Sequence, residues 1–201
     1  MQSIYQVCKP LILASASPRR QKYFQDLGLA FRVHAADIDE TSLPKENPQA
    51  FVQRMAEEKA RAVMKLYPES WVVAADTVIN FAGLVLGKPK GRAEAVSMLM
   101  QLSGEEHRVQ TGVCLACHQE NILAVQFVTT QVVFSRFSEK TAEAYAATGE
   151  PLDKAGAYGI QGKGAFLVKE IRGSYSNVVG LPLCELLAML EKYGVIAVST
   201  F

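Results

Sequence analysis

The apolar positions of this 201-residue chain recur with two different periods, and the alternation between the two predicts an α/β fold. Short, continuous apolar runs, which are typical of strands covered on both faces, lie at 11–14 and 71–75. Two longer β-like segments, 109–116 and 122–134, are expected to pair as a hairpin. Apolar residues three and four positions apart predict helices at 18–27, 47–66, 92–102, 138–147 and 183–193.

Shorter elements are expected in the remaining chain. Strands are predicted at 31–34 and 165–171, and a polar turn at 173–177 follows the second of them. A hairpin is predicted to join 78–81 to 84–86. Neither a repeat nor a low-complexity linker interrupts the pattern, so we expect a single compact domain. The buried face of the helix at 92–102 is expected to include Val96, Leu99 and Met100.

The connection between the first strand and the first helix carries candidate anion-binding chemistry. Ser17 is placed to cap the helix, and Pro18 suits its first position. Arg19 and Arg20 follow in the first turn, where the helix dipole disfavours cations. Free backbone N–H groups, a hydroxyl such as that of Ser15 and two guanidinium groups favour a phosphate-sized anion; the alternative is two solvated surface arginines.

Carboxylates gather at two further places. Asp37, Asp39 and Glu40 lie close together in the polar segment 35–47, where they could hold a hard cation or form a solvated acidic loop. Asp76 is expected at the end of a buried strand, where α/β proteins usually place ligands. It could act as a base or a metal ligand there, and the alternative is an aspartate that caps a turn.

Two glycine-containing turns complete the candidate chemistry. Lys88 lies in the stiff sequence Gly87-Lys88-Pro89, as either a phosphate contact or one more surface lysine. The segment 150–164 contains four glycines, which permit close approach of the backbone to a ligand. Its spacing matches neither a P-loop nor a dinucleotide fingerprint.

Composition limits the function classes. The chain has 21 basic and 20 acidic residues, so no general attraction for nucleic acid is expected. No apolar run approaches the roughly 20 residues that span a bilayer, and the N-terminal sequence lacks the features of a secretory signal. We therefore expect a cytoplasmic protein without nucleic-acid or membrane partners.

The four cysteines are expected to be structural thiols. The sequence Cys114-Leu-Ala-Cys117-His118 matches a haem-attachment pattern, but it lies in a β-like run where residues three apart point to opposite faces. We therefore do not expect haem there.

Five segments, taken together and in order, resemble the Maf family of nucleoside triphosphate pyrophosphatases. They are Leu13-Ala-Ser-Ala-Ser-Pro-Arg-Arg20, Ala75-Asp-Thr-Val78, Gly87-Lys-Pro89, Glu150-Pro-Leu-Asp-Lys-Ala-Gly-Ala-Tyr-Gly-Ile-Gln-Gly162 and Asn177-Val-Val-Gly-Leu-Pro-Leu183. The resemblance implies a mixed twisted sheet flanked by helices, in two lobes around a nucleotide cleft, similar to inosine triphosphate pyrophosphatases. It also implies that residues 1–201 form one such domain, which hydrolyses a nucleoside triphosphate to the monophosphate and pyrophosphate with Mg²⁺ or Mn²⁺.

The resemblance assigns roles to individual residues. Asp76 would be the general base or a metal-associated carboxylate, with Glu40 beside it as a metal ligand. The residues that would bind the triphosphate are Ser15, Arg20, Lys59 and Lys88.

Three positions indicate the branch of the family. The branch that acts on dTTP and UTP has the residues found here as Arg19, Thr77 and Gln161, whereas a sister branch associated with 7-methyl-GTP tends to have tryptophan, glutamine and glutamate. Gln161 presents both a donor and an acceptor, which suits the edge of uracil or thymine. The resemblance therefore implies a dTTP/UTP pyrophosphatase and suggests a homodimer. A nucleotide-binding regulator of cell division or septum formation, without essential catalysis, is the alternative.

Overall fold

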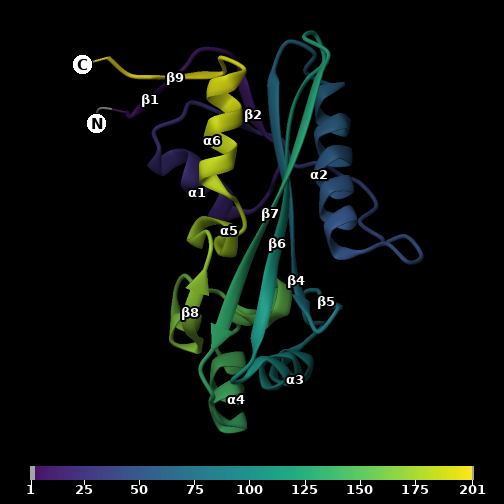
Figure 1. Ribbon diagram of the computed structural model, residues 1–201, viewed down its shortest axis with the longest axis vertical. Helices are drawn as coiled ribbons and strands as arrows, with labels where there is room; N and C mark the ends of the chain where they lie inside the picture. Colours follow the sequence, from purple (N-terminus) through teal and green to yellow (C-terminus); the bar gives the residue numbers. More distant parts are fainter. Residues whose placement is uncertain (1–2, 201) are drawn as a thin grey trace. The chain divides into compact units, whose positions relative to one another are not determined.

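The computed structural model describes residues 3–200, and its internal contacts divide the chain into two compact units. The first unit holds the described parts of Met1–Asp76, Thr111–Phe127 and Gly180–Phe201, and the second holds Thr77–Gln110 and Val128–Val179. One mixed sheet has the strand order β3-β2-β4-β6-β7-β8, and β5 pairs with β4 (Figure 1). Helices flank this sheet, so the predicted fold class is confirmed.

The first unit is built on parallel strands. Strand β2 (Leu11–Leu13) lies between β3 (Arg32–Val33) and β4 (Trp71–Phe81) and runs parallel to both. The register between β2 and β4 ends with Leu13 opposite Val73. The parallel arrangement accounts for the continuous apolar sequence of β2 and of the first half of β4.

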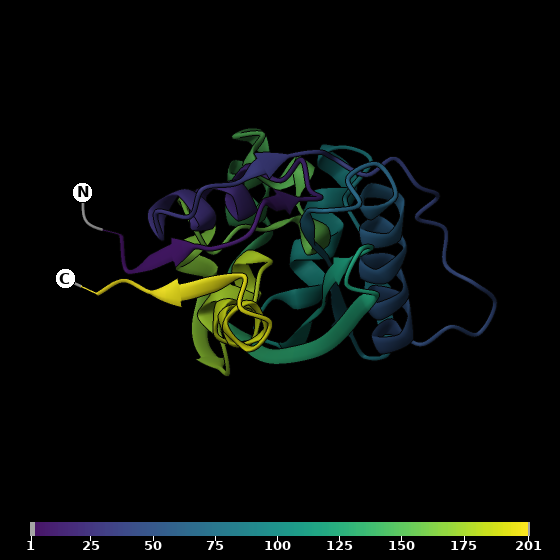
Figure 2. The same cartoon turned by 90° about the horizontal axis from the view of Figure 1, so that it is seen from above.

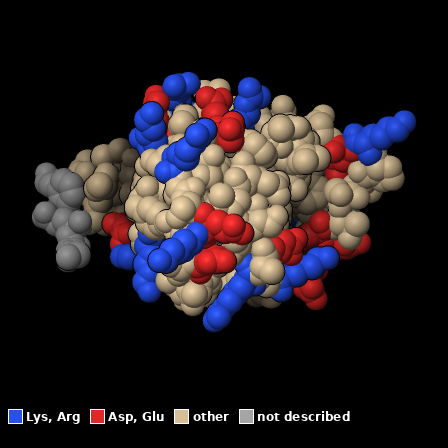
Figure 3. All heavy atoms as spheres, turned by 90° about the horizontal axis from the view of Figure 1, so that it is seen from below, with Lys and Arg blue, Asp and Glu red and all other residues tan. Residues whose placement is uncertain are grey.

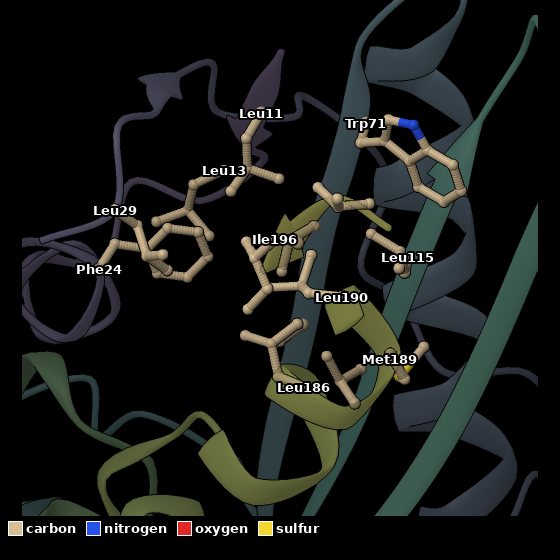
Figure 4. Close-up of a cluster of buried hydrophobic side chains, with 14 of the residues drawn as sticks. Leu11, Leu13, Phe24, Leu29, Trp71, Leu115, Leu186, Met189, Leu190 and Ile196 are labelled. Carbon is tan, nitrogen blue, oxygen red and sulfur yellow. The ribbon is translucent and has the colours of Figure 1, made fainter. Parts of the chain in front are cut away.

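Helices cover both faces of these strands. Helices α1 (Pro18–Asp26) and α6 (Leu183–Lys192) pack on one face, and α2 (Pro48–Met64) packs on the other (Figures 1 and 2). Neighbouring residues of a strand point in opposite directions. Trp71 therefore contributes to the core shown in Figure 4, whereas Val72 contributes to the core beneath α2.

Strand β6 (Glu106–Cys117) follows the same alternation. Cys114 packs in the α2 core and Cys117 in the opposite core, so the predicted placement of these thiols on opposite faces is confirmed. A Cβ atom at Gly112 would lie 2.2 Å from the carbonyl oxygen of Val52. Only glycine therefore lets the backbone of α2 approach the strand this closely.

The two ends of the described chain pair with each other. Strand β1 (Tyr5–Val7) runs antiparallel to β9 (Ile196–Val198), in a two-stranded sheet of their own (Figure 2). The sequence pattern did not predict these strands, because each has three residues and each finds its partner at the other end of the chain.

The second unit surrounds its own core, which includes Leu99, Leu102, Phe134 and Tyr158. Two predictions for it are confirmed: residues of β4 and β5 form a hairpin, and β6 and β7 are neighbours in the sheet. The elements that contribute to this unit, besides β4 and β6, are β5 (Leu84–Leu86), α3 (Arg92–Leu102), β7 (Ile122–Phe134), α4 (Glu139–Ala147), η1 (Glu150–Asp153), η2 (Ala155–Ala157), η3 (Lys163–Leu167), β8 (Val168–Arg172) and α5 (Tyr175–Val179).

Three local predictions for this unit are wrong. The expected strand at 165–171 begins only at Val168, because the preceding residues form the 3-10 helix η3. The expected polar turn at 173–177 contains the start of α5, where Ser174 Oγ accepts a hydrogen bond from Asn177 N at 3.2 Å. Met100 is 36% exposed, because the buried stripe of α3 consists of Ala95, Met98, Leu99 and Leu102.

Among residues 3–200, no helix is both long and apolar enough to cross a membrane.

Candidate functional site

A buried lysine joins two carboxylates in the first unit. Lys59 Nζ, on α2, lies 2.7 Å from Asp76 Oδ1 on β4 and 2.9 Å from Glu40 Oε1 in the loop before α2. Lys59 and Asp76 are each 8% exposed, whereas the side chain of Glu40 is 58% exposed. The structure therefore brings together three predicted site residues from distant parts of the sequence.

Asp76 does not end its strand, so that prediction is wrong. Strand β4 continues to Phe81, and its later residues pair with β5, beginning with Ile79 opposite Leu86. Asp76 instead lies three residues beyond Val73, with which the register to β2 ends. The carboxylate thus follows the end of the parallel β2–β4 pairing, but it is held in a continuing strand rather than in a turn.

Arg20 is anchored beside these charges. Its Nη1 donates to the carbonyl oxygen of Ala75 at 2.8 Å and to Ser15 Oγ at 3.2 Å, and its Nε donates to the carbonyl oxygen of Gly180 at 2.8 Å. Burial lowers the pKa of the Arg20 guanidinium, and the negative charge of Asp76 acts in the opposite direction. Arg20 is therefore a fixed positive charge next to Asp76 as well as a brace between α1 and β4.

The start of α1 differs from its prediction in one detail. Ser17 occupies the N-cap position, but its side chain makes no capping hydrogen bond; its backbone N–H donates to Ser15 Oγ at 3.2 Å. Ser15 is buried, whereas Arg19 is partly exposed in the first turn of the helix. The hydroxyl of Ser15 thus orders both the turn and the guanidinium of Arg20.

Helix α2 also holds the loop that carries Glu40. Arg54 donates to Glu46 through Nε and Nη2, at 2.7 Å each, and Nη2 donates to the carbonyl oxygen of Thr41 at 3.1 Å. The hydrogen bonds from Arg54 are the largest influence on Glu46 and bring the pKa of its carboxyl to about 2. This ion pair fixes the loop directly after Glu40.

The first unit offers a suitable donor set for a hard divalent cation. Mg²⁺ is usually held by one or two carboxylates, with waters and substrate phosphates as its other ligands. Glu40 and Asp76 converge on one point, the Lys59 ammonium, and the exposed Glu40 side chain is accessible from solvent. Within the described residues no group of three or more His, Cys, Asp or Glu side chains forms a metal cluster. The residues present therefore fit a cation shared with a phosphate better than a cation held by protein alone.

The second unit holds the other predicted residues, Thr77, Lys88 and Gln161. Thr77 follows Asp76 directly in β4 and is partly exposed, whereas Lys88 and Gln161 are exposed on loops. The backbone N–H of Gly156 donates to the carbonyl oxygen of Gly87 at 3.0 Å. This bond ties the turn that carries Lys88 to the glycine-rich segment that carries Gln161.

Two side chains near Gln161 received no role from the sequence. Tyr145 on α4 and Glu150 in η1 make hydrogen bonds to the backbone of Gly159, Lys163 and Gly164. Glu150 opens the longest of the family-like segments, and an acidic residue shortly before several glycines was the available signal. No sequence signal marked Tyr145, because it resembled one more apolar residue of a predicted helix.

On the face that Figure 3 shows, basic and acidic side chains are interspersed, in keeping with the balanced composition.

Comparison with known proteins identifies relatives along nearly the whole chain. A protein from Desulfotalea psychrophila called "dTTP/UTP pyrophosphatase" is 53% identical over 195 residues, which is 97% of this chain and 100% of that protein. A protein of the same name from Myxococcus xanthus is 52% identical over 184 residues, 92% of each chain. Both matches extend through the two compact units.

Solved structures support the fold. The Staphylococcus aureus Ham1 protein has a TM-score of 0.55 at 16% identity, with 92% of this chain and 100% of that chain covered. A HAM1 protein from Coxiella burnetii has a TM-score of 0.53 at 17% identity, with coverage of 92% and 99%. The sequence model of Maf, described as Maf-like protein, matches residues 10–193. This chain belongs to the Maf family.

Proposed function

We propose that this protein hydrolyses dTTP and UTP to the nucleoside monophosphate and pyrophosphate. The observation that carries the proposal is the pair of carboxylates, Asp76 and Glu40, joined by buried Lys59 in a chain about half identical to proteins named dTTP/UTP pyrophosphatase. Those names favour an enzyme over the alternative regulator of cell division.

The side chains of the first unit suit attack on the α-phosphorus. A water oxygen forms the new bond to phosphorus, the bond from the α-phosphorus to the bridging oxygen breaks, and pyrophosphate leaves with the electron pair. Asp76 accepts a proton from the attacking water, and Lys59 holds its carboxylate in place. Arg20, braced by Ser15, places a fixed positive charge toward the phosphates.

We propose Glu40 and Asp76 as the residues that hold Mg²⁺ or Mn²⁺. When bound, such a cation neutralises charge on the phosphate oxygens and lowers the pKa of its bound water. The Glu40 side chain is exposed, so it could leave Lys59 and serve as a ligand of such a cation.

Substrate recognition is proposed for the remaining predicted residues. Lys88 contacts the triphosphate as a point charge. Gln161 reads the base through its amide, and Arg19 and Thr77 contribute to the choice of pyrimidine. The exposure of Lys88 and Gln161 leaves both side chains available to a ligand.

We further propose that residues 1–201 act as one domain, because one family model spans both compact units. A cytoplasmic location, a homodimer and the lack of a nucleic-acid partner stay predictions.

The test measures pyrophosphate and orthophosphate release from a panel of nucleoside triphosphates, including 7-methyl-GTP, with Mg²⁺ and with Mn²⁺. We expect pyrophosphate from dTTP and UTP, and a fall of at least about a thousandfold in kcat for Asp76→Asn. Asp26→Asn on α1, an exposed aspartate, is the matched control. Orthophosphate as the product, full activity of Asp76→Asn, or preference for 7-methyl-GTP would each contradict the proposal.

A further inference from the structure

The short segment from Gly159 to Gly164, which carries Gln161, is held at both ends by the same pair of side chains. Tyr145 Oη accepts a hydrogen bond from Gly159 N at 3.1 Å and donates one to Glu150 Oε1 at 2.9 Å. Glu150 Oε1 also accepts from Gly164 N at 3.1 Å. The two ends of the segment are thus connected through one phenol and one carboxylate.

The backbone of this segment is closed tightly on itself. A Cβ atom at Gly164 would lie 2.4 Å from Tyr145 Oη and 2.5 Å from the carbonyl oxygen of Gly159. Gly162 has a φ of 96°, and a Cβ atom there would lie 3.1 Å from Glu150 Oε2. The glycines of this segment therefore serve contact with Tyr145, Glu150 and the segment's own backbone, in addition to any approach of a ligand.

Glu150 is held in its ionised form by donors that surround it. Burial alone would raise the pKa of its carboxyl, but hydrogen bonds from Lys163 N, Tyr145 Oη and Gly164 N bring the pKa below its usual range. Lys163 N donates to Oε2 at 3.1 Å, so both carboxylate oxygens are used. Lys154 Nζ donates to the backbone carbonyl oxygen of Glu150 at 2.6 Å and fixes the residue itself.

The Gln161 residue differs in exposure from the groups that hold its segment. Gly159, Gly164 and Tyr145 are buried, whereas Gln161 is exposed. A glutamine side chain has several rotatable bonds, so the place where its amide meets a base depends on how firmly its backbone is held. In the segment from Gly159 to Gly164 it is the backbone that is held in place, and Glu150 and Tyr145 hold it.

We propose that Glu150 and Tyr145 are positioning residues for pyrimidine selection, because they hold segment 159–164 in the conformation that presents the Gln161 amide to the base. This inference rests on the role given to Gln161 under the proposed function. It assigns to Glu150 and Tyr145 a role in choosing the substrate, without direct contact with the reacting phosphates.

The test replaces Glu150 by glutamine, which has nearly the same shape but turns an NH₂ group toward backbone donors. We expect KM for UTP to rise about tenfold with a smaller change in kcat, and discrimination between UTP and CTP to fall by a similar factor. Amide hydrogen exchange in residues 159–164 should become faster. Glu143→Gln, an exposed glutamate on α4, removes the same charge and should change neither measurement.

Tyr145→Phe keeps the ring in the core and removes only the hydroxyl. It should therefore also lower the discrimination between UTP and CTP and make amide hydrogen exchange in residues 159–164 faster. Gln161→Glu tests the proposed function separately, since it changes the reading group and leaves its supports in place. Unchanged exchange in Glu150→Gln would overturn the positioning role. Faster exchange with unchanged discrimination, in a protein where Gln161→Glu does alter discrimination, would also overturn it. Unaltered discrimination in Gln161→Glu would instead refute the role of Gln161 on which the inference rests.

Discussion

The two compact units differ in whether they bury charged side chains. The first unit buries the ion pair of Lys59 and Asp76, besides the uncharged side chains of Ser15 and Thr111. The second unit buries polar side chains without formal charge: His107, Gln110, Thr130 and Asn177. Of its candidate ligand-binding residues, Lys88 and Gln161 are exposed and Thr77 is partly exposed.

This difference indicates that the two units have different roles in the proposed reaction. Removing charges from water costs free energy that an ion pair rarely recovers in full, so buried charges mark places where a fold serves chemistry. Exposed side chains on a rigid backbone suit selection of a ligand instead. We infer that the first unit supplies the reactive groups and that the second supplies most of the residues proposed for recognition, with Arg19 of the first unit as the exception.

The largest expected effect comes from breaking the buried pair. Lys59→Met keeps the bulk of the side chain but leaves Asp76 buried without its partner, so we expect a loss of about 3 kcal/mol in the free energy of unfolding. We also expect kcat/KM for UTP to fall at least about a hundredfold. Chemical denaturation measures the free energy of unfolding, and steady-state kinetics measures kcat/KM. Lys65→Met, at the exposed end of α2, is the control, and equal behaviour of both variants would refute the distinction between the units.

A second prediction concerns the neutral groups of the second unit. Burial lowers the pKa of His107 to about 4, from a usual value of 6.5, so the folded state resists its protonation. The stabilisation is complete above pH 6.5 and is lost as the pH falls toward 4, by about 2 kcal/mol at pH 4.5.

Urea unfolding of His107→Gln at pH 7 and pH 4.5 checks this prediction. The variant should show a weaker loss of stability on acidification than the parent protein, whereas His118→Gln, at an exposed position, should match the parent. If all three proteins lose stability equally, His107 does not provide the acid sensitivity.

The smallest expected effect lies on the exposed surface of the second unit. Lys88→Met should raise KM for UTP about tenfold with little change in the free energy of unfolding, because only a contact with the triphosphate is lost. Lys90→Met changes a second exposed lysine in the same turn and should leave KM nearly unchanged. A similar rise in KM for both variants would indicate general electrostatic attraction rather than a specific contact.

Local pattern was enough to predict most elements but not their nonlocal pairings. The caps of α2 and α4 follow from Asn47 and Ser138, whose side chains accept hydrogen bonds from Ala50 N and Thr141 N. The strand was expected to end at Asp76, but pairing of later β4 residues with β5 continues it to Phe81. Tertiary hydrogen bonds overrode the local signal there.

The candidate site shows the same limit. The resemblance put Glu40 beside Asp76 and assigned Lys59 to the triphosphate, whereas the structure joins both carboxylates through the Lys59 ammonium group. The role of Glu150 depends on a phenol five residues earlier and on N–H groups thirteen and fourteen residues later. Sequence spacing contains no information on such a network, because the fold alone brings its members together.

The pairing of β1 with β9 has a practical consequence. Because Tyr5 lies opposite Val198 in an antiparallel ladder, a tether added beyond either strand leaves the protein from the same edge of the first unit. Attachment to a solid support through either terminus should therefore present the same surface to solution, which simplifies the design of immobilised or tandem-fused forms.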